Sequence, residues 1–533
     1  MNFADLVLRN GKIVTMDNEE SIKHSIAVKF GRIVDVGSND DIESYIGNET
    51  ELIELNGRTI IPGLIDSHSH YINTGSERKI YIDLSEEAGV DSISDIQTIL
   101  KEKASNTPMG KWIFGYQEDD SKLQEKRHPL RTELDEISLE HPILITTVGG
   151  HFWMANSKAF EIAGVNKNSP DPTGGKFDRD PESGELTGGL HEEAYNLLRP
   201  DGPPKPSREQ AYIGAKQILE ECASVGITCV YDLVSETEIR AAIDLKNAGN
   251  LPIRVRMDIN IDLLNNLEKL GIYRGLGDDW LRISGLKFFF DGAISARTAA
   301  VSEPYLNKPN FYGVMSTTKE IATEVLTKAY KSGYRISAHA NGDRAIEMYL
   351  DIIEQLQRKY PRKDPRNRDI HCTVINDILI NRIKELKLLP TIFGSYAYYH
   401  GDKLLPAFGE KRLDSMFAAN SFLTAGVKIS AHSDHPCSPY QPLMAIHSLV
   451  NRKTKSGKPI GQNQKINVIN ALKLYTINAA YHSFDEDKLG SIEVGKLADF
   501  VVLGEDILTV PSEKIIDIPI DMTIIEGNIV FKQ

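Results

Sequence analysis

His68 and His70 stand two residues apart at the end of a β-branched run, residues 60–70, whose sequence is IIPGLIDSHSH. In an extended strand the side chains at positions i and i+2 leave from the same face, so both imidazoles can reach one point in space. Neutral imidazole is a common ligand of Zn²⁺. The pair therefore indicates a metal site, although a core or surface histidine at either position is an alternative that the motif alone leaves open.

Four further predicted strands carry metal-competent residues near their ends, namely Lys287, His339, His371 and Asp434. In a parallel barrel the carboxyl ends of the strands meet at the face where such enzymes do chemistry, whereas the strand interiors hold branched aliphatic side chains. Each residue alone has a structural alternative: a lysine can snorkel, a histidine can belong to the core, and an aspartate can cap the next helix. Their coincidence at one rim favours a metal centre.

Eight β-rich segments, separated by helical patterns, are the elements that must position these residues. This alternation predicts a parallel sheet, and eight strands are the number that closes a (β/α)8 TIM barrel, an α/β fold. The strands are expected at residues 60–70, 227–233, 253–259, 281–292, 334–340, 369–374, 389–395 and 427–434.

Both ends of the chain have a different texture, in which short apolar strands alternate with Gly-containing turns. This predicts a small composite β-sandwich domain formed by residues 1–59 and 486–533, with the barrel at residues 60–485. A long insertion, about residues 76–215, follows the first barrel strand and contains the Gly/Pro/Asp-rich stretch SPDPTGGKFDRDPESGELTGG. So long an irregular segment is usually a functional lid or disordered, and its aromatic residues and GGHFW favour a lid.

The composition limits the possible partners. Lys and Arg total 61 against 75 Asp and Glu, so the formal net charge is −14, and nucleic acid is an unsuitable partner for such a surface. No window approaches the roughly twenty apolar residues of a membrane span, and the N-terminus lacks a signal-peptide pattern. The four cysteines form no CxxC pair, which suits a reducing compartment. We expect a soluble cytoplasmic protein that acts on a small molecule.

Several motifs together resemble one family. They are PGLIDSHSH, GGHFWMANSKAF, GELTGGLHEEA, LKFFFDGAISARTAA, AHANGDRAI, SDHP, LYTINAAY and GSIEVGKLADFVVL. With these motifs the chain resembles the amidohydrolase superfamily, and within it the YtcJ-like branch that includes N-substituted formamide deformylases. The resemblance covers nearly the whole chain, and it implies a metal-dependent hydrolase with a TIM barrel. A homodimer is a common arrangement in this family.

The resemblance also implies roles for the candidate ligands. His68 and His70 would bind the more buried metal ion, and His339 and His371 the second. Lys287 would bridge the two ions as an N-carboxylated lysine, because an ammonium group is not a ligand whereas a carbamate is an anionic oxygen donor. Asp434 would bind metal and carry the proton, so the implied catalytic residues are Asp434 and Lys287. One or two divalent ions, most readily Zn²⁺, are expected per chain.

Two places depart from the family pattern. Many relatives have Ile-Glu-His before the sixth-strand ligand, whereas this chain has Asp369-Ile370-His371, so the supporting acid is displaced or missing. Near Asp434 the usual small residue is replaced by His432, and His435 follows. His432 lies two residues from Asp434 and shares its strand face, so it could donate to substrate or merely fill the mouth of the barrel.

Further residues are candidates for contact with substrate. His151 matches a family position near the substrate, and Trp153 and Tyr116 could form apolar walls or simply pack within the insertion. Asp291, four residues after Lys287, is expected to point towards the mouth. Arg297 could steady an anionic intermediate, although a surface salt bridge is the alternative. With His432, the expected substrate-binding residues are His151, Trp153, Asp291, Arg297 and His432.

These observations predict a hydrolase that cleaves the C–N bond of an amide or an N-substituted formamide, using a metal-activated hydroxide and Asp434 as proton carrier. Attack on an amidine carbon of an aminated heterocycle, as in a deaminase, is the first alternative. A barrel without catalysis that serves as a binding protein is the second. All six candidate ligand positions carry metal-competent residues, which argues against the second alternative.

Overall fold

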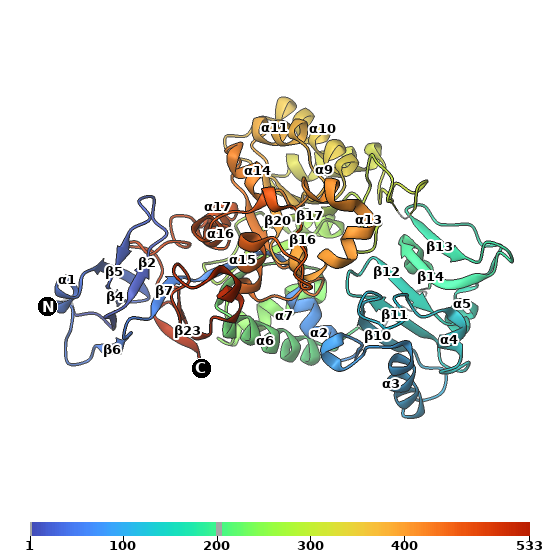
Figure 1. Cartoon of the computed structure of the whole chain (residues 1–533), viewed down its shortest axis with the longest axis horizontal. Helices are drawn as coiled ribbons and strands as arrows, with labels where there is room; N and C mark the ends of the chain where they lie inside the picture. Colours follow the sequence, from blue (N-terminus) through green and yellow to red (C-terminus); the bar gives the residue numbers. More distant parts are fainter. Residues whose placement is uncertain (1–2, 199–204, 307) are drawn as a thin grey trace.

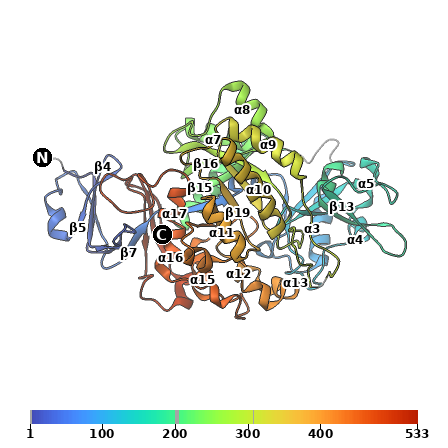
Figure 2. The ribbon, with the colours of Figure 1, turned by 90° about the horizontal axis from the view of Figure 1, so that it is seen from above.

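The computed structural model describes residues 3–198, 205–306 and 308–533. It has three parts along its long axis: strands of both termini at one end, a barrel in the middle, and the inserted segment at the other end (Figure 1). The view from above shows the same order (Figure 2). None of the described helices is both long and apolar enough to cross a membrane.

The barrel is an eight-stranded parallel sheet whose strands follow one another in chain order. The strands are β8 (Leu64–Ser69), β15 (Ile227–Val234), β16 (Arg254–Asn260), β17 (Leu281–Phe289), β18 (Ile336–Ala340), β19 (Arg368–His371), β20 (Leu389–Phe393) and β21 (Ser430–His432). Between the two outer strands, the Asp434 N–H donates to the carbonyl of His68 at 3.1 Å, and the His70 N–H donates to that of His435 at 2.9 Å. These bonds join the first strand to the chain after the last. The predicted (β/α)8 barrel is confirmed.

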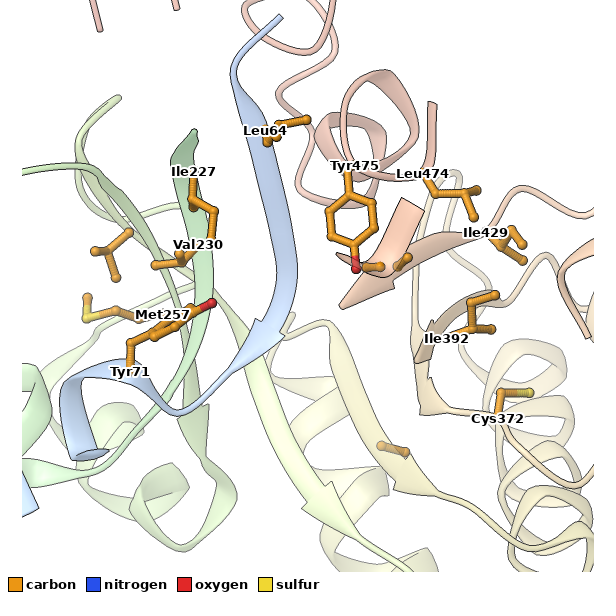
Figure 3. Close-up of a cluster of buried hydrophobic side chains, with 14 of the residues drawn as sticks. Leu64, Tyr71, Ile227, Val230, Met257, Cys372, Ile392, Ile429, Leu474 and Tyr475 are labelled. Carbon is orange, nitrogen blue, oxygen red and sulfur yellow. The ribbon is translucent and has the colours of Figure 1, made fainter. Parts of the chain in front are cut away.

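Helices cover the outside of the barrel. They include α2 (Tyr71–Glu77), α6 (Arg208–Ser224), α7 (Glu236–Asn247), α8 (Leu264–Leu270), α9 (Lys319–Lys331), α10 (Asp343–Lys359), α11 (Asp377–Glu385), α13 (Gly401–Leu413), α14 (Ala419–Thr424), α15 (Pro442–Asn451), α16 (Val468–Leu474) and α17 (Ile477–His482). In α10, for example, Ile346, Leu350 and Ile353 recur at helical spacing and are buried. Leu64, Ile227 and Ile392 belong to the same buried cluster (Figure 3). Burying each such side chain stabilises the fold by about 2 kcal/mol.

Strands from both ends of the chain build two further sheets. One is β5 (Arg32–Gly37), β4 (Ser25–Lys29), β1 (Leu6–Arg9) and β6 (Glu51–Glu54). The other is β24 (Asn528–Lys532), β23 (Ile520–Ile525), β22 (Phe500–Leu503), β7 (Thr59–Pro62), β2 (Lys12–Val14) and β3 (Ile22–Lys23). Residues of the two sheets share one buried cluster, for example Ile26 and Phe500. The composite β-sandwich is therefore part of the fold, as the sequence predicts.

The chain passes from sandwich to barrel at Gly63. β7 ends at Pro62 and β8 begins at Leu64, so a single residue separates two strands that belong to different sheets. A Cβ atom at Gly63 would lie 2.2 Å from Oγ1 of Thr228. Only glycine fits there without displacing β15, because a non-bonded approach this close is strongly repulsive.

The inserted segment differs from the irregular stretch that its composition indicates. It forms a six-stranded sheet of β13 (Gly175–Arg179), β14 (Leu186–Glu192), β12 (Phe152–Ala155), β11 (Ile143–Thr147), β10 (Ile113–Glu118) and β9 (Ile82–Asp83). Helices α3 (Ile93–Ser105), α4 (Arg131–Asp135) and α5 (Ser157–Ala163) accompany it. Two buried apolar clusters lie within this segment, which accounts for its order. Residues 199–204 lie outside the described residues.

A buried ion pair attaches the sandwich to the barrel. The guanidinium of Arg254, on β16, donates from Nε and Nη2 to the carboxylate of Asp499 at 2.8 and 2.9 Å, and Nη2 also lies 3.1 Å from Glu526. The Arg254 side chain is fully buried. Asp499 lies in the GKLADF motif just before β22, so this motif has a structural role: its carboxylate compensates the charge of a barrel arginine.

We expect Asp499→Asn to lower the free energy of unfolding by about 3–5 kcal/mol, because it leaves the Arg254 charge buried without its main partner. Chemical denaturation followed by circular dichroism measures the change. Glu185→Gln is the matched control, since its pair with Lys167 is exposed and screened by solvent and should contribute little to stability. Equal effects of the two substitutions would contradict this role of Asp499.

Candidate metal centre

The two histidines of the first barrel strand converge on one carboxylate. His68 lies within β8 and His70 directly follows it, and their ring centroids are 5.1 Å apart. Nε2 of each lies 3.3 Å from Oδ1 of Asp434, which follows β21, the strand beside β8 in the closed barrel. His68 and Asp434 are buried, whereas the side chain of His70 is 26% exposed. The two imidazoles therefore reach one point, as their spacing predicts.

Lys287 lies beside this group at the end of the fourth strand. Its Nζ is 3.0 Å from Nε2 of His68, and the side chain is fully buried. Burial lowers the pKa of Lys287 to about 7, against the opposing effect of the Asp434 and Asp258 carboxylates. The neutral amine is the form that can react with CO₂ to give a carbamate, so this environment favours the modification that the resemblance implies.

His339 and His371 form the opposite side of the group. Nδ1 of His339 is 3.1 Å from Nε2 of His371. On its other edge, Nε2 of His339 is 3.2 Å from the carbonyl oxygen of Gly292. Nδ2 of Asn341 lies 3.1 Å from the same nitrogen. Nε2 of His339 therefore faces polar groups of the adjoining loops, whereas Nδ1 faces His371.

The backbone is strained at two of these positions. His371 has φ of 82° and Asp434 has φ of 57°, in the left-handed region that residues other than glycine rarely adopt. Such conformations are costly and cluster at functional sites. His371 lies at the same end of the barrel as the other candidate ligands, although Asp369-Ile370 precedes it where many relatives have Ile-Glu.

The donor set fits a divalent metal ion. His68, His371 and Asp434 each offer a ligand atom within 4.8 Å of the others. Burial lowers the pKa of His68, His339 and His371 well below 6.5, so these rings are neutral and can donate a lone pair. For Asp434 burial acts to raise the pKa, but His371, His68 and His70 outweigh it and hold the pKa well below 3.8. Neutral imidazoles and an ionised carboxylate are the ligands that Zn²⁺ prefers.

A cavity of about 330 Å³ opens onto this group. His70, His339, His371 and Asp434 contribute to its wall on the barrel side. The inserted segment supplies the aromatic part of the wall, with Tyr81, Phe114, Tyr116, Trp153 and Tyr195. Trp153 stacks on Tyr195 with ring centroids 4.2 Å apart. Trp153 and Tyr116 therefore lie where apolar walls were expected.

His151 also lies in the cavity wall and is held by an acidic partner. Its Nδ1 is 2.7 Å from Oε2 of Glu192, at the end of β14. Burial alone would lower the pKa of His151, but the Glu192 carboxylate outweighs burial and the pKa lies above 6.5. The ring centroid is 5.3 Å from that of His339, so His151 faces the candidate ligands across the cavity.

Three expected substrate-binding residues do not line this cavity. Asp291 is buried and accepts backbone N–H groups of Asn341, Gly342 and Ala300 at 2.8–2.9 Å, so it joins the segment after β17 to the loop after β18. Burial raises its pKa to about 7. Arg297 lies 3.4 Å from Asp120, in the ion-pair role that was its alternative. His432 is buried beneath the group, with its ring centroid 5.0 Å from that of His371.

Other acidic residues support the site and were not predicted. Asp66 accepts from the hydroxyl of Tyr71 at 2.8 Å and from the N–H of Ser433, next to Asp434, at 3.1 Å. Asp232 accepts the N–H groups of Tyr71 and Ile72 at 2.6 and 2.9 Å, at the start of α2. Asp66 could have been found, because it stands two residues before His68 on the same strand face. No comparable spacing in the sequence pointed to Glu192 or Asp232.

Comparison with known proteins agrees with this geometry. A model of the amidohydrolase family matches residues 51–531. The chain belongs to the amidohydrolase family. Among its amidohydrolase relatives, it is 29% identical to the YtcJ protein of Bacillus subtilis (strain 168), covering 99% of both chains. It is 27% identical to the N-substituted formamide deformylase of Arthrobacter pascens, covering 98% of this chain and 97% of the relative.

Solved structures agree as well. A crystal structure of a metal-dependent hydrolase from Pyrococcus horikoshii OT3 is 26% identical to this amidohydrolase, with a TM-score of 0.75. The match covers 95% of this chain and 99% of that one. The superfamily predicted from the sequence motifs is therefore confirmed.

We expect Glu192→Gln to lower the pKa of His151 below 6.5, because burial then acts without the opposing carboxylate. An NMR titration of the imidazole nitrogens measures this pKa. The control is Asp178→Asn, which removes the carboxylate 2.9 Å from Nε2 of His191 in the same sheet and should leave His151 unchanged. A pKa of His151 that stays above 6.5 in Glu192→Gln would show that a group other than Glu192 raises it.

Proposed function

We propose that this amidohydrolase cleaves the C–N bond of a small-molecule amide, with an N-substituted formamide as the leading candidate. The observation that carries the proposal is the convergence of His68, His70 and Asp434 beside buried Lys287, at the inner end of a cavity. The formamide is suggested by the relative that is named N-substituted formamide deformylase.

The proposed metal ligands are His68, His70, His339, His371, Asp434 and the carboxylated form of Lys287. Bound divalent ions, with zinc the expected metal, would lower the pKa of a water molecule and polarise the carbonyl. The neutral amine of Lys287 would add CO₂ and release a proton to give the carbamate, a reaction that the ammonium form cannot undergo because it has no lone pair. The low pKa of Lys287, about 7, supports this step.

Asp434 is the proposed proton carrier. It is ionised, so it can accept the proton of the attacking water, and it lies in the wall of the cavity where the substrate would be bound. Returning this proton to the leaving nitrogen makes a neutral amine the leaving group, which lowers the barrier to C–N cleavage.

The aromatic part of the cavity wall favours a substrate that carries an apolar substituent on its nitrogen. Aromatic side chains of the inserted segment, Tyr81, Phe114 and Trp153 among them, face the candidate ligands from the other side of the cavity. Aromatic walls contribute large apolar contact areas and favour flat or aliphatic groups over charged ones. A formyl group is small enough to leave most of this cavity to the substituent on nitrogen.

Elemental analysis of the purified protein, combined with a panel of amides and formamides assayed for released amine, tests this proposal. We expect one or two equivalents of divalent metal and release of amine together with a carboxylic acid. Release of ammonia from an aminated heterocycle would instead indicate a deaminase. Absence of metal and of activity after metal supplementation would refute metal-dependent hydrolysis.

We expect Lys287→Ala to remove measurable activity, and short carboxylic acids such as acetate to restore part of it by replacing the carbamate oxygens. The amine-release assay with and without added acid measures both effects. Lys319→Ala is the control, since Lys319 is a surface residue of α9 and should be silent. Full activity of Lys287→Ala would mean that this lysine is structural.

We expect Asp434→Asn to reduce turnover by a factor on the order of 10² to 10⁴, the usual contribution of a positioned general acid or base. Asparagine keeps the shape and one ligand oxygen but cannot hold a proton between steps. Steady-state kinetics of the folded, metal-loaded variant measures the loss. Near-normal turnover would assign the proton to a different group.

A further inference from the structure

His432 packs directly against two of the candidate ligands. Its ring centroid lies 5.0 Å from that of His371 and 5.6 Å from that of His68, and the latter two are themselves 5.6 Å apart. The planes of the three rings cross at 62–73°, so the rings are splayed and not stacked. His68 and His432 are completely buried, and His371 is 2% exposed. The three imidazoles thus form a nearly equilateral triangle inside the barrel.

These distances are those of imidazoles that share an ion. A ring whose nitrogen lies about 2.0–2.1 Å from zinc has its centroid roughly 3.2 Å from the ion, so two such rings at a tetrahedral angle have centroids roughly 5 Å apart. The triangle of His68, His371 and His432 matches this value on one side and exceeds it slightly on the other two. Ligand atoms of His68, His371 and Asp434 already lie within 4.8 Å of one another, and a rotation of the His432 ring would bring one of its nitrogens to this group.

Neither ring nitrogen of His432 has a hydrogen-bond partner among the residues that the structure describes. A fully buried imidazole without partners is costly, because it loses its bonds to water on folding. Phe393 packs on its other side at 4.6 Å between centroids and offers no polar group. The two nitrogens of His432 therefore have no partner unless an ion or molecule bound in the site contacts them.

His435 is a second buried histidine of the same segment, but it does not pack against the candidate ligands. Both of its ring nitrogens are also buried and have no hydrogen-bond partner within the described ranges. However, its ring stacks on Tyr71 at 5.3 Å and lies against Tyr440 at 5.0 Å, away from the triangle. His435 differs from His432 chiefly in its neighbours, which makes it a suitable reference.

We infer that His432 is an additional imidazole ligand of the metal centre, binding an ion that it shares with His68 and His371. This ion would replace the division implied by the family resemblance, in which His68 and His371 bind different ions, and it agrees with the ligand atoms of His68, His371 and Asp434 lying within 4.8 Å of one another. The inference rests on the proposed metal-dependent function and extends it. One more nitrogen donor makes the site richer in imidazole and favours zinc and neighbouring transition metals over magnesium, calcium and manganese, which prefer oxygen donors.

The structure of the zinc-loaded wild-type protein, with zinc located by anomalous scattering, tests this directly and needs no variant. We expect a zinc ion within about 2.3 Å of one nitrogen of His432. Zinc bound by the other ligands, with both His432 nitrogens more than about 3 Å away, overturns the inference but leaves the proposed function intact. Absence of zinc from the whole group overturns both.

Zinc affinity gives a second, independent readout. His432→Phe keeps a ring in place but removes both nitrogens, and we expect it to bind zinc on the order of 10-fold or more weakly than wild type in competition with a chelator. His435→Phe is the matched control and should bind zinc as wild type does. Equal zinc affinity of His432→Phe and wild type would overturn the inference, whatever the activity of the variant.

Discussion

Asp434 has to keep a negative charge while it is buried, and the site depends on how the barrel makes this possible. Burial favours the protonated acid, but the imidazoles of His68, His70 and His371 surround the carboxylate and outweigh this effect. His68 lies on β8, His70 follows it and His371 lies on β19, while Asp434 follows β21, the last strand. The Asp434 N–H donates to the His68 carbonyl and joins the last strand to the first, so closure of the barrel and ionisation of the carboxylate rest on the same few residues.

A second layer of polar groups keeps this arrangement fixed. Below the candidate ligands, Asp258 accepts from Arg335 and Arg368 at 3.2 and 2.9 Å, and all three side chains are fully buried. This ion cluster replaces the aliphatic filling that barrel interiors usually have. The two guanidinium groups share the Asp258 carboxylate, and Arg368 also donates to the hydroxyl of Thr391 at 3.2–3.3 Å. The same charges set the electrostatic surroundings of Lys287.

The sequence predicted the barrel well because its strands depend on local patterns. The same patterns brought His68 and His70, which stand at the end of β8, and Asp434, which follows β21, to one group of candidate ligands. Long-range placement was harder: Asp291 turned to accept backbone N–H groups of the next loop, and the sequence does not show that the chain bends there. The inserted sheet was missed because its strands are short and a Gly/Pro-rich turn interrupts their alternation.

Two parts of the chain form the wall of the cavity, the barrel and the inserted sheet. The barrel contributes the proposed metal ligands, whereas residues of the inserted sheet contribute most of the remaining wall. We expect substitutions within β10, β11 or β12 to alter which molecules fit without disturbing the proposed ligands. Such a division lets evolution diversify specificity in one segment while the chemistry stays constant, and a laboratory library could be confined to the same segment.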